Sequence, residues 1–215
     1  MRAGSMFYAT PYLYAKLVSL ACVQLEKLRG SLLSIKQNVL SPDTQAEINI
    51  PQSEVKEQLN DIIRHHIQIL NYINVLQEFS GLLTCGILFL FLLTLCFCAF
   101  SVIMSWDDPV DLYQGAWLYF AVVVMAFFYC SMGTVLAQEF EAVGEAAYAS
   151  DWVGAPVPYQ KSISFMMLIS NKGKTLVGGG IVPVTNETLM SMINESMSLF
   201  MFLLTMKDKS EKSNA

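Results

Sequence analysis

Two long runs without charged side chains set the strongest limit on how this chain can fold. One extends from Phe79 to Ser105 and the other from Leu112 to Gln138. As helix each would be about 40 Å long, and each exceeds the ~20 residues that cross the apolar core of a bilayer. Buried helices of a large soluble protein are the alternative, but two adjacent runs are too long for that. The sequence therefore predicts an integral membrane protein.

The remaining composition fits a membrane protein and shows no enzyme signature. Hydrophobic residues make up 54% of the chain and charged residues 14%, and the net charge of −5 gives no nucleic-acid signal. No catalytic set, phosphate loop or metal-ligand spacing is present, so we expect no cofactor, no metal and no catalysis. His65 and His66 follow Arg64 in a polar helix and are expected on a solvated surface. The cysteines lie in apolar stretches and are expected to pack as single small residues: Cys22, Cys85, Cys96, Cys98 and Cys130.

The charge pattern predicts how the chain crosses the membrane. The link from Trp106 to Asp111 carries three acids and neither Lys nor Arg. Basic residues instead precede the first run and follow the second: Lys27, Arg29, Lys36, Lys56, Arg64, Lys161, Lys172 and Lys174. The positive-inside rule then places the link outside the cell and both flanking regions in the cytoplasm. The tail from Lys207 is left outside, although its three lysines argue mildly against this topology.

The last helix, about Thr185 to Met206, combines membrane length with one polar face. Its polar side chains recur at steps that keep them on one side of an α-helix, and we call them the polar stripe: Glu187, Ser191, Asn194, Ser198 and Thr205. The other side is apolar: Leu189, Met192, Ile193, Leu199, Phe200, Leu203 and Leu204. Ionisable groups are costly in lipid, so the stripe must face water or protein. This makes the helix a candidate pore helix, with hydrogen bonding between helices as the alternative.

A break is expected before this helix. The apolar stretch from Ser162 to Ser170 is too short to span a bilayer and is expected to be a cytoplasmic packing helix. Asn171-Lys-Gly-Lys and Gly178-Gly-Gly180 then interrupt the helix, and Pro183 and Thr185 restart it. The last element is therefore predicted to be a broken helix, with a short inner half and a membrane-crossing outer half.

Several motifs, in their order along the chain, resemble the insect odorant receptor family, whose seven-helix members are unrelated to G-protein-coupled receptors. Those that follow the family's sixth helix and the link after it are Phe-Phe-Tyr-Cys130, Glu139 to Glu145, Tyr148-x-x-x-Trp152 and Pro158-Tyr159-x-Lys161. Those that follow its seventh helix are Gly179, Pro183-Val-Thr-Asn-Glu-Thr188 and Ser198-x-Phe200-x-x-Leu203. Those that resemble its fourth and fifth helices are Gln24-x-x-Lys27-Leu28, Arg64-His-His66 and Glu78-Phe79-Ser80. The chain departs from the family at Met197, where an aromatic is frequent, and at Gly180, where Lys is common.

The resemblance implies an all-α membrane protein that is the C-terminal part of a seven-transmembrane-helix tuning receptor, about helices four to seven, and so a partial sequence. The expected segments are the end of helix 4 with its cytoplasmic extension (1–35), a cytoplasmic loop (36–52), the cytoplasmic and transmembrane parts of helix 5 (53–78 and 79–105), an extracellular loop (106–112), transmembrane helix 6 (113–138), a cytoplasmic link (139–161), the cytoplasmic and pore-side halves of helix 7 (162–175 and 185–206) and an extracellular tail (207–215).

The resemblance also implies a function in olfactory signal transduction. It implies an odorant-gated, non-selective cation channel in which four subunits, tuning receptors together with a shared odorant receptor co-receptor, surround one pore. The expected ligand is a volatile, apolar odorant or pheromone, and the expected location is the plasma membrane of olfactory sensory neuron dendrites, with the C-terminus outside. A secondary transporter with a broken helix and a non-conducting membrane scaffold remain the alternatives.

Three sets of site residues follow. The expected pore lining is Glu187, Met190, Ser191, Asn194, Met197, Ser198, Met201 and Thr205. The expected odorant pocket, where apolar contact and a few hydrogen bonds would hold the ligand, is Phe97, Phe100, Ser101, Tyr113, Trp117 and Phe120. The expected subunit anchor, an aromatic cluster beside acids that fits a polar-rimmed interface, is Tyr148, Trp152, Tyr159 and Phe165.

Overall fold

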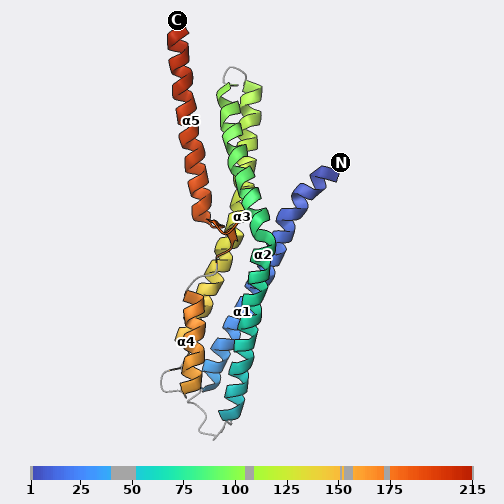
Figure 1. Cartoon of the computed structure of the whole chain (residues 1–215), viewed down its shortest axis with the longest axis vertical. Coiled ribbons are helices and arrows are strands. Elements are labelled where there is room, and N and C mark those ends of the chain that lie inside the picture. Colours follow the sequence, from blue (N-terminus) through green and yellow to red (C-terminus); the bar gives the residue numbers. More distant parts are fainter. Residues whose placement is uncertain are drawn as a thin grey trace. The chain divides into compact units, whose positions relative to one another are not determined.

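The structure, a computed structural model, describes residues 2–39, 52–104, 109–150, 152, 157–171 and 175–214. Within these ranges it contains five helices and one small hairpin (Figure 1). The elements are α1 (Arg2–Val39), α2 (Gln52–Met104), α3 (Pro109–Ala149), α4 (Val157–Asn171), β1 (Val177–Gly178), β2 (Val182–Pro183) and α5 (Asn186–Asn214). Three stretches are long and apolar enough to cross a membrane: Glu57–Val102, Pro109–Ala149 and Asn186–Met206. The predicted all-α membrane fold is confirmed, apart from the short hairpin.

The helices extend beyond the uncharged runs that predicted them. α3 begins at Pro109, inside the expected extracellular loop, because proline suits a first helical position where its missing N–H has no intrahelical partner. It continues to Ala149, into the segment expected to be a link. Pro11 lies inside α1. Parts of several expected segments lie outside the described residues: 1–35, 36–52, 79–105, 106–112, 139–161, 162–175 and 207–215.

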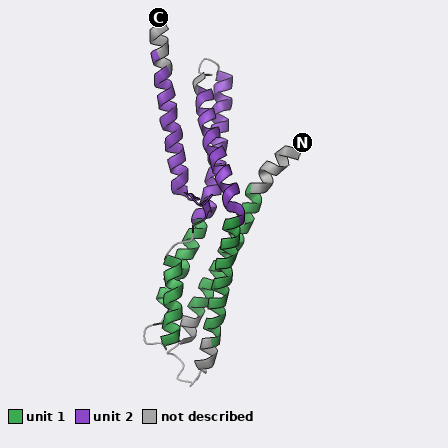
Figure 2. Ribbon diagram, viewed as in Figure 1, with its two compact units in different colours: residues 1–78, 135–175 green, residues 79–134, 176–215 purple. Residues whose placement is uncertain are grey.

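The chain divides into two compact units (Figure 2). Unit 1 comprises residues 1–78 and 135–175, and unit 2 comprises residues 79–134 and 176–215. Both α2 and α3 contribute to each unit. The division of α2 falls at Phe79, where its uncharged run begins, so the polar part of α2 belongs to unit 1 and the apolar part to unit 2.

Unit 1 has a core built from one seam of side chains on each of four helices. The seam residues recur at alternating steps of three and four, the spacing that keeps side chains on one face of packed helices. They are Val18, Ala21, Leu25, Leu28 and Leu32 on α1; Leu59, Ile62, His66, Ile69, Ile73 and Leu76 on α2; Leu136, Phe140, Val143 and Ala147 on α3; and Ile163, Met166 and Ser170 on α4. Arg29 of α1 and Glu139 of α3 add an ion pair at 3.8 Å beside this core.

His66 occupies a core position, so the prediction that it lies on a solvated surface is wrong. Its side chain is 1% exposed, and neither ring nitrogen has a hydrogen-bond partner among the described residues. Burial, and to a smaller extent the charge of His65, lowers the pKa of His66 from its ordinary value of 6.5. The seam explains the error, because the three-and-four spacing from Ile62 to Ile69 passes through position 66 whatever residue stands there.

We expect unit 1 to lose stability as the pH falls below 6.5. An unfolded chain protonates its histidines near pH 6.5, whereas buried His66 gains a proton only at lower pH, so acid favours the unfolded state. His66→Leu should flatten this dependence, measured as thermal unfolding of the detergent-solubilised protein from about pH 8 to about pH 5. His65→Leu is the control and should keep most of it, because burial is the larger cause of the shift. Identical pH dependence in the wild type and His66→Leu would contradict the prediction.

Unit 2 contains the apolar parts of α2 and α3, which run antiparallel, together with the hairpin and α5 (Figure 2). The hydroxyls of Thr84 and Tyr129 form a buried hydrogen bond of 3.0 Å between α2 and α3. Phe91 packs edge-on against the ring of Tyr129, with centroids 6.3 Å apart. Farther along, Gly115 lets α3 approach α2, since a Cβ there would lie 3.1 Å from a methyl of Val102. These contacts fix the register of the two helices.

Candidate functional site

The glycine-rich segment before α5 forms a tight hairpin. β1 pairs with β2 in antiparallel register, Val177 opposite Pro183 and Gly178 opposite Val182. Gly179 and Gly180 have φ angles of +60° and +75°, which glycine adopts without strain, and with Ile181 they form the three-residue connection between the strands. The N–H of Ile181 donates to the carbonyl of Gly178 at 3.1 Å and closes the turn. The predicted break at Gly178–Gly180 is confirmed, and its form is a hairpin.

Glycines let this hairpin lie directly against α2. The N–H of Gly179 donates to the helix carbonyl of Gly81 at 2.7 Å. A Cβ on Gly178 would lie 3.2 Å from the backbone N and Cα of Cys85, and one on Gly179 would lie 3.1 Å from the Cys85 Sγ. The hairpin is therefore attached to α2 at close range, and side chains at these glycine positions would crowd Cys85.

The start of α5 is attached to α3 in a similar way. Gly133 of α3 lies so close to Val184 that a Cβ there would overlap the Val184 carbonyl oxygen. One residue along α3, the hydroxyl of Thr134 accepts a hydrogen bond of 3.0 Å from the N–H of Asn186. These two contacts hold the first turn of α5 at a fixed place on α3.

Thr185 caps the N-terminus of α5. Its hydroxyl accepts the N–H of Thr188 at 3.4 Å, the usual bond from an N-cap side chain to the third helical residue. The hydroxyl of Thr188 donates back to the Pro183 carbonyl at 2.6 Å. Together these bonds define where the hairpin ends and the helix begins.

The polar stripe lies on the exposed side of α5. All eight residues expected to line a pore are exposed in the chain: Glu187, Met190, Ser191, Asn194, Met197, Ser198, Met201 and Thr205. Among the side chains of α5 that the structure describes, the buried ones are Leu189, Met192 and Ser196, exposed by 3%, 7% and 1%. At about 100° per residue, Ser196 lies about 180° around the helix from Glu187 and about 160° from Ser198. The stripe is thus directed away from the helix's own packing face.

A second exposed line runs beside the stripe. Glu195, Leu199, Phe202 and Met206 are exposed, and helical geometry places them about 60° to 120° from Glu187. Leu199, which the sequence placed on the apolar side, is 37% exposed. Glu195 adds an ionisable group to this surface, so the exposed side of α5 is wider than the five polar residues suggested.

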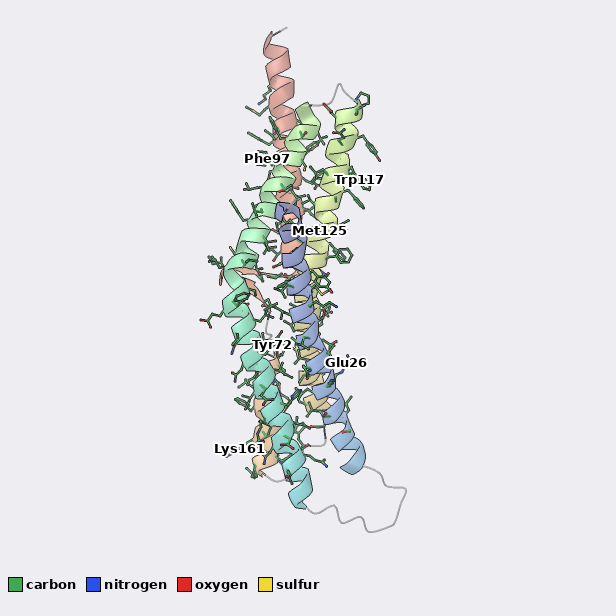
Figure 3. The ribbon with its side chains drawn as sticks, turned by 90° about the vertical axis from the view of Figure 1, so that its right-hand side faces the viewer. Glu26, Tyr72, Phe97, Trp117, Met125 and Lys161 are labelled. Atoms are coloured by element: carbon green, nitrogen blue, oxygen red, sulfur yellow. The ribbon has the colours of Figure 1, made fainter. Side chains whose placement is uncertain are left out.

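The six residues expected to hold an odorant all lie near the C-terminal end of α2 or the N-terminal end of α3 in unit 2, and all are exposed. Phe97 and Trp117, labelled in Figure 3, are 70% and 62% exposed on α2 and α3. The rings of Trp117 and Phe120 lie together, with centroids 6.3 Å apart. The other three are Phe100, Ser101 and Tyr113. By helical geometry Phe97, Phe100 and Ser101 share one face of α2, and Tyr113, Trp117 and Phe120 share one face of α3. Val102 and Gly115 face each other between the two helices and lie about 140° from Phe97 and about 160° from Trp117. The two aromatic faces are therefore separate, and a further protein element would have to cover either one to make a pocket.

The four anchor residues lie in unit 1. Tyr148 is 71% exposed at the end of α3, and Phe165 is 49% exposed on α4. Trp152 and Tyr159 are half-buried, and the indole N–H of Trp152 donates to the carbonyl of Tyr148 at 3.3 Å. Unit 1 therefore presents exposed aromatic surface on α3 and α4.

Comparison with known proteins decides the family. Residues 3–197 match the family described as "7tm Odorant receptor". The chain belongs to the odorant receptor family. Its relatives include Odorant receptor Or2 of Anopheles gambiae, 25% identical over 92% of this chain and 50% of that protein. Others are Odorant receptor 22a of Drosophila melanogaster (23% identical over 69% of this chain and 37% of that protein) and Putative odorant receptor 92a of the same species (23%, over 89% and 47%).

This odorant receptor chain spans half or less of the length of those relatives. The match over residues 3–197 confirms the family resemblance inferred from motifs. The matched region includes α1 to α4, the hairpin and the first part of α5. The aromatic faces of α2 and α3 and the exposed face of α5 as far as Met197 therefore lie within the matched region.

Contacts between α3 and the α5 region escaped the sequence reasoning in this odorant receptor chain. They are the fit of Gly133 against Val184, the bond from Asn186 to Thr134, and a hydrogen bond of 3.2 Å between the hydroxyls of Tyr119 and Ser196. A glycine inside an apolar helix is a recognisable signal, because small residues let membrane helices approach closely. Gly133 carries that signal, whereas nothing in the sequence pairs Tyr119 with Ser196.

Proposed function

We propose that this chain forms the C-terminal half of a subunit of an odorant-gated, non-selective cation channel. In this proposal the subunit assembles with a shared odorant receptor co-receptor as a heterotetramer, and α5 of each subunit lines the central pore. The observation that carries the proposal is the polar stripe. It lies on the side of a membrane-length helix opposite the buried residues Leu189, Met192 and Ser196.

The stripe supports an ion path because placing its polar side chains in lipid would cost free energy. A carboxylate, an amide and hydroxyls on a membrane helix are stable when they face water or polar partners. In a closed ring of four subunits, the side of α5 opposite its own packing face points to the centre, where water and cations pass. Exposed methionines beside the stripe, Met190, Met197 and Met201, provide an apolar constriction that can close by loss of water.

The exposed aromatic faces of α2 and α3 in unit 2 support binding of a volatile, apolar odorant or pheromone. Trp117, Phe120 and Phe97 offer broad apolar contact, and Ser101 and Tyr113 offer hydroxyls. Their exposure fits a pocket that is completed by parts of the receptor that this chain does not contain. The aromatic residues of unit 1 would serve as the contact between subunits.

We place the receptor in the plasma membrane of the sensory neuron, and the charge pattern supports its orientation across that membrane. Unit 1 would lie on the cytoplasmic side, and the C-terminus would lie outside. α5 then has its first turn, with Glu187, at the inner mouth of the pore. A carboxylate at this mouth would attract cations and repel anions.

The proposal predicts odorant-evoked cation currents. A complete receptor containing this chain, expressed with the co-receptor, should give such currents when an odorant panel is applied, with a reversal potential near zero in mixed Na⁺ and K⁺ solutions. The co-receptor alone is the control. Silence across the panel with both proteins at the cell surface would contradict the channel function. Uptake of substrate without current would instead favour a transporter.

A further inference from the structure

A hydrogen bond connects α3 to the back of α5 in unit 2. The hydroxyls of Tyr119 and Ser196 lie 3.2 Å apart although the residues are 77 positions apart in the sequence. Ser196 is 1% exposed, and its hydroxyl donates to the carbonyl of Ile193 at 2.8 Å. A serine hydroxyl has a single hydrogen, so Tyr119 must donate the bond between the two residues. The phenol of α3 is thus attached to a fixed acceptor on α5.

The bond acts on α5 from the side opposite the polar stripe. Ser196 lies about 160° to 180° around the helix from Ser198 and Glu187. A displacement of Tyr119 toward or away from α5 therefore moves the stripe along the line that joins the two helices. Below this point, the hairpin and the contacts of Gly133 and Thr134 hold the start of α5. Movement at Ser196 would accordingly tilt α5 about its attached first turn.

The helix that carries Tyr119 also carries one of the aromatic faces proposed to bind odorant, the face of Tyr113, Trp117 and Phe120. Trp117 and Phe120 project from one side of α3, about 60° apart by helical geometry, and their rings are in contact range. Tyr119 is about 160° from Trp117 on the same helix. α3 thus carries the ligand surface on one side and the bond to the pore helix on the other. A rigid helix displaced by a ligand on the first side would transmit that displacement to the second.

We propose that the Tyr119–Ser196 hydrogen bond couples the odorant surface to the pore, and that Tyr119 is a positioning residue for gating. This inference rests on the proposed channel function. The bond between Tyr119 and Ser196 contributes to the equilibrium between closed and open channels and has no role in ion selection. Removing either hydroxyl changes that equilibrium, and the effect of one removal depends on whether the other partner is present.

A double-mutant cycle tests the coupling in the complete receptor expressed with the co-receptor. Tyr119→Phe and Ser196→Ala should each shift the odorant concentration for half-maximal current about threefold to tenfold in the same direction, the range for one hydrogen bond. Current without odorant should change in the opposite sense, as a shifted closed–open equilibrium requires. The double variant should shift no further than one single variant. Ser196→Thr, which keeps the hydroxyl, should resemble the wild type.

Two controls separate coupling from damage to the fold. Tyr72→Phe removes the bond of 3.0 Å from the Tyr72 hydroxyl to the Leu17 carbonyl in unit 1 and should leave the odorant response unchanged. The reversal potential should be unaltered in every variant. Additive shifts, unchanged half-maximal concentrations, or a loss of maximal current alone would overturn the coupling while the channel function stands. A wild-type receptor that reaches the surface and conducts nothing would overturn both.

Discussion

Ser198→Cys in α5 is expected to make the channel sensitive to a positively charged thiol reagent, which should remove most of the odorant-evoked current. Ser198 is exposed at the centre of the polar stripe, so reagent from the water phase can reach it. A fixed positive charge raises the energy of a cation 4 Å away by about 1 kcal/mol in water and about 4 kcal/mol at an intermediate dielectric. Each 1.4 kcal/mol is a factor of ten. We therefore expect the current, recorded under voltage clamp before and after reagent, to fall about tenfold or more.

The control variant is Leu189→Cys on the opposite side of the same helix. Leu189 is 3% exposed and lies about 180° around the helix from Ser198, so the same reagent should leave its current unchanged. The wild type is a second control for the native cysteines, of which Cys98 and Cys130 are buried. If the reagent removed the current of Leu189→Cys and left that of Ser198→Cys unchanged, the pore would lie on the other face of α5.

The polar stripe was predictable because it depends on local sequence alone. Steps of three and four residues fix which side chains share a helix face, whatever packs against the helix. The exposure of Glu187 and Ser198 opposite buried Met192 follows from that periodicity. The two uncharged runs predicted the membrane helices in the same way, since their length is a property of the sequence.

The contacts that position α5 were not predictable because they join residues that are distant in sequence. The turn residues Gly179 and Gly180 indicated a break, but the docking of Gly179 on Gly81 depends on how α2 passes the hairpin. His66 shows the same limit within unit 1. Its polar neighbours suggested a surface position, whereas its place on the seam of α2 decided its burial.

Gly133 is a position in unit 2 that cannot accept a side chain unless the backbone moves. Its hypothetical Cβ would overlap the carbonyl oxygen of Val184, which is backbone and cannot rotate away. Val184 is itself held by the bond from its N–H to the Leu176 carbonyl at 2.8 Å. α3 or the start of α5 would have to move to admit even one methyl group.

Gly133→Ala is therefore expected to destabilise the protein by about 2 kcal/mol net, since overpacking against backbone that cannot rotate away should cost the upper end of about 1 to 3 kcal/mol. This cost opposes the gain of up to about 1 kcal/mol that alanine brings inside a helix. Gly86→Ala is the matched control, because Gly86 also lies inside a unit 2 helix and a Cβ there meets nothing within 4 Å. Thermal unfolding of the detergent-solubilised protein, followed by size-exclusion chromatography of a fluorescent fusion, should show a lower midpoint for Gly133→Ala and an equal or higher one for Gly86→Ala.

Because the same contact fixes the first turn of α5, Gly133→Ala receptors that still reach the surface should also lose odorant-evoked current. Wild-type stability and current in Gly133→Ala would mean that α3 and the start of α5 are not in close contact in the folded protein.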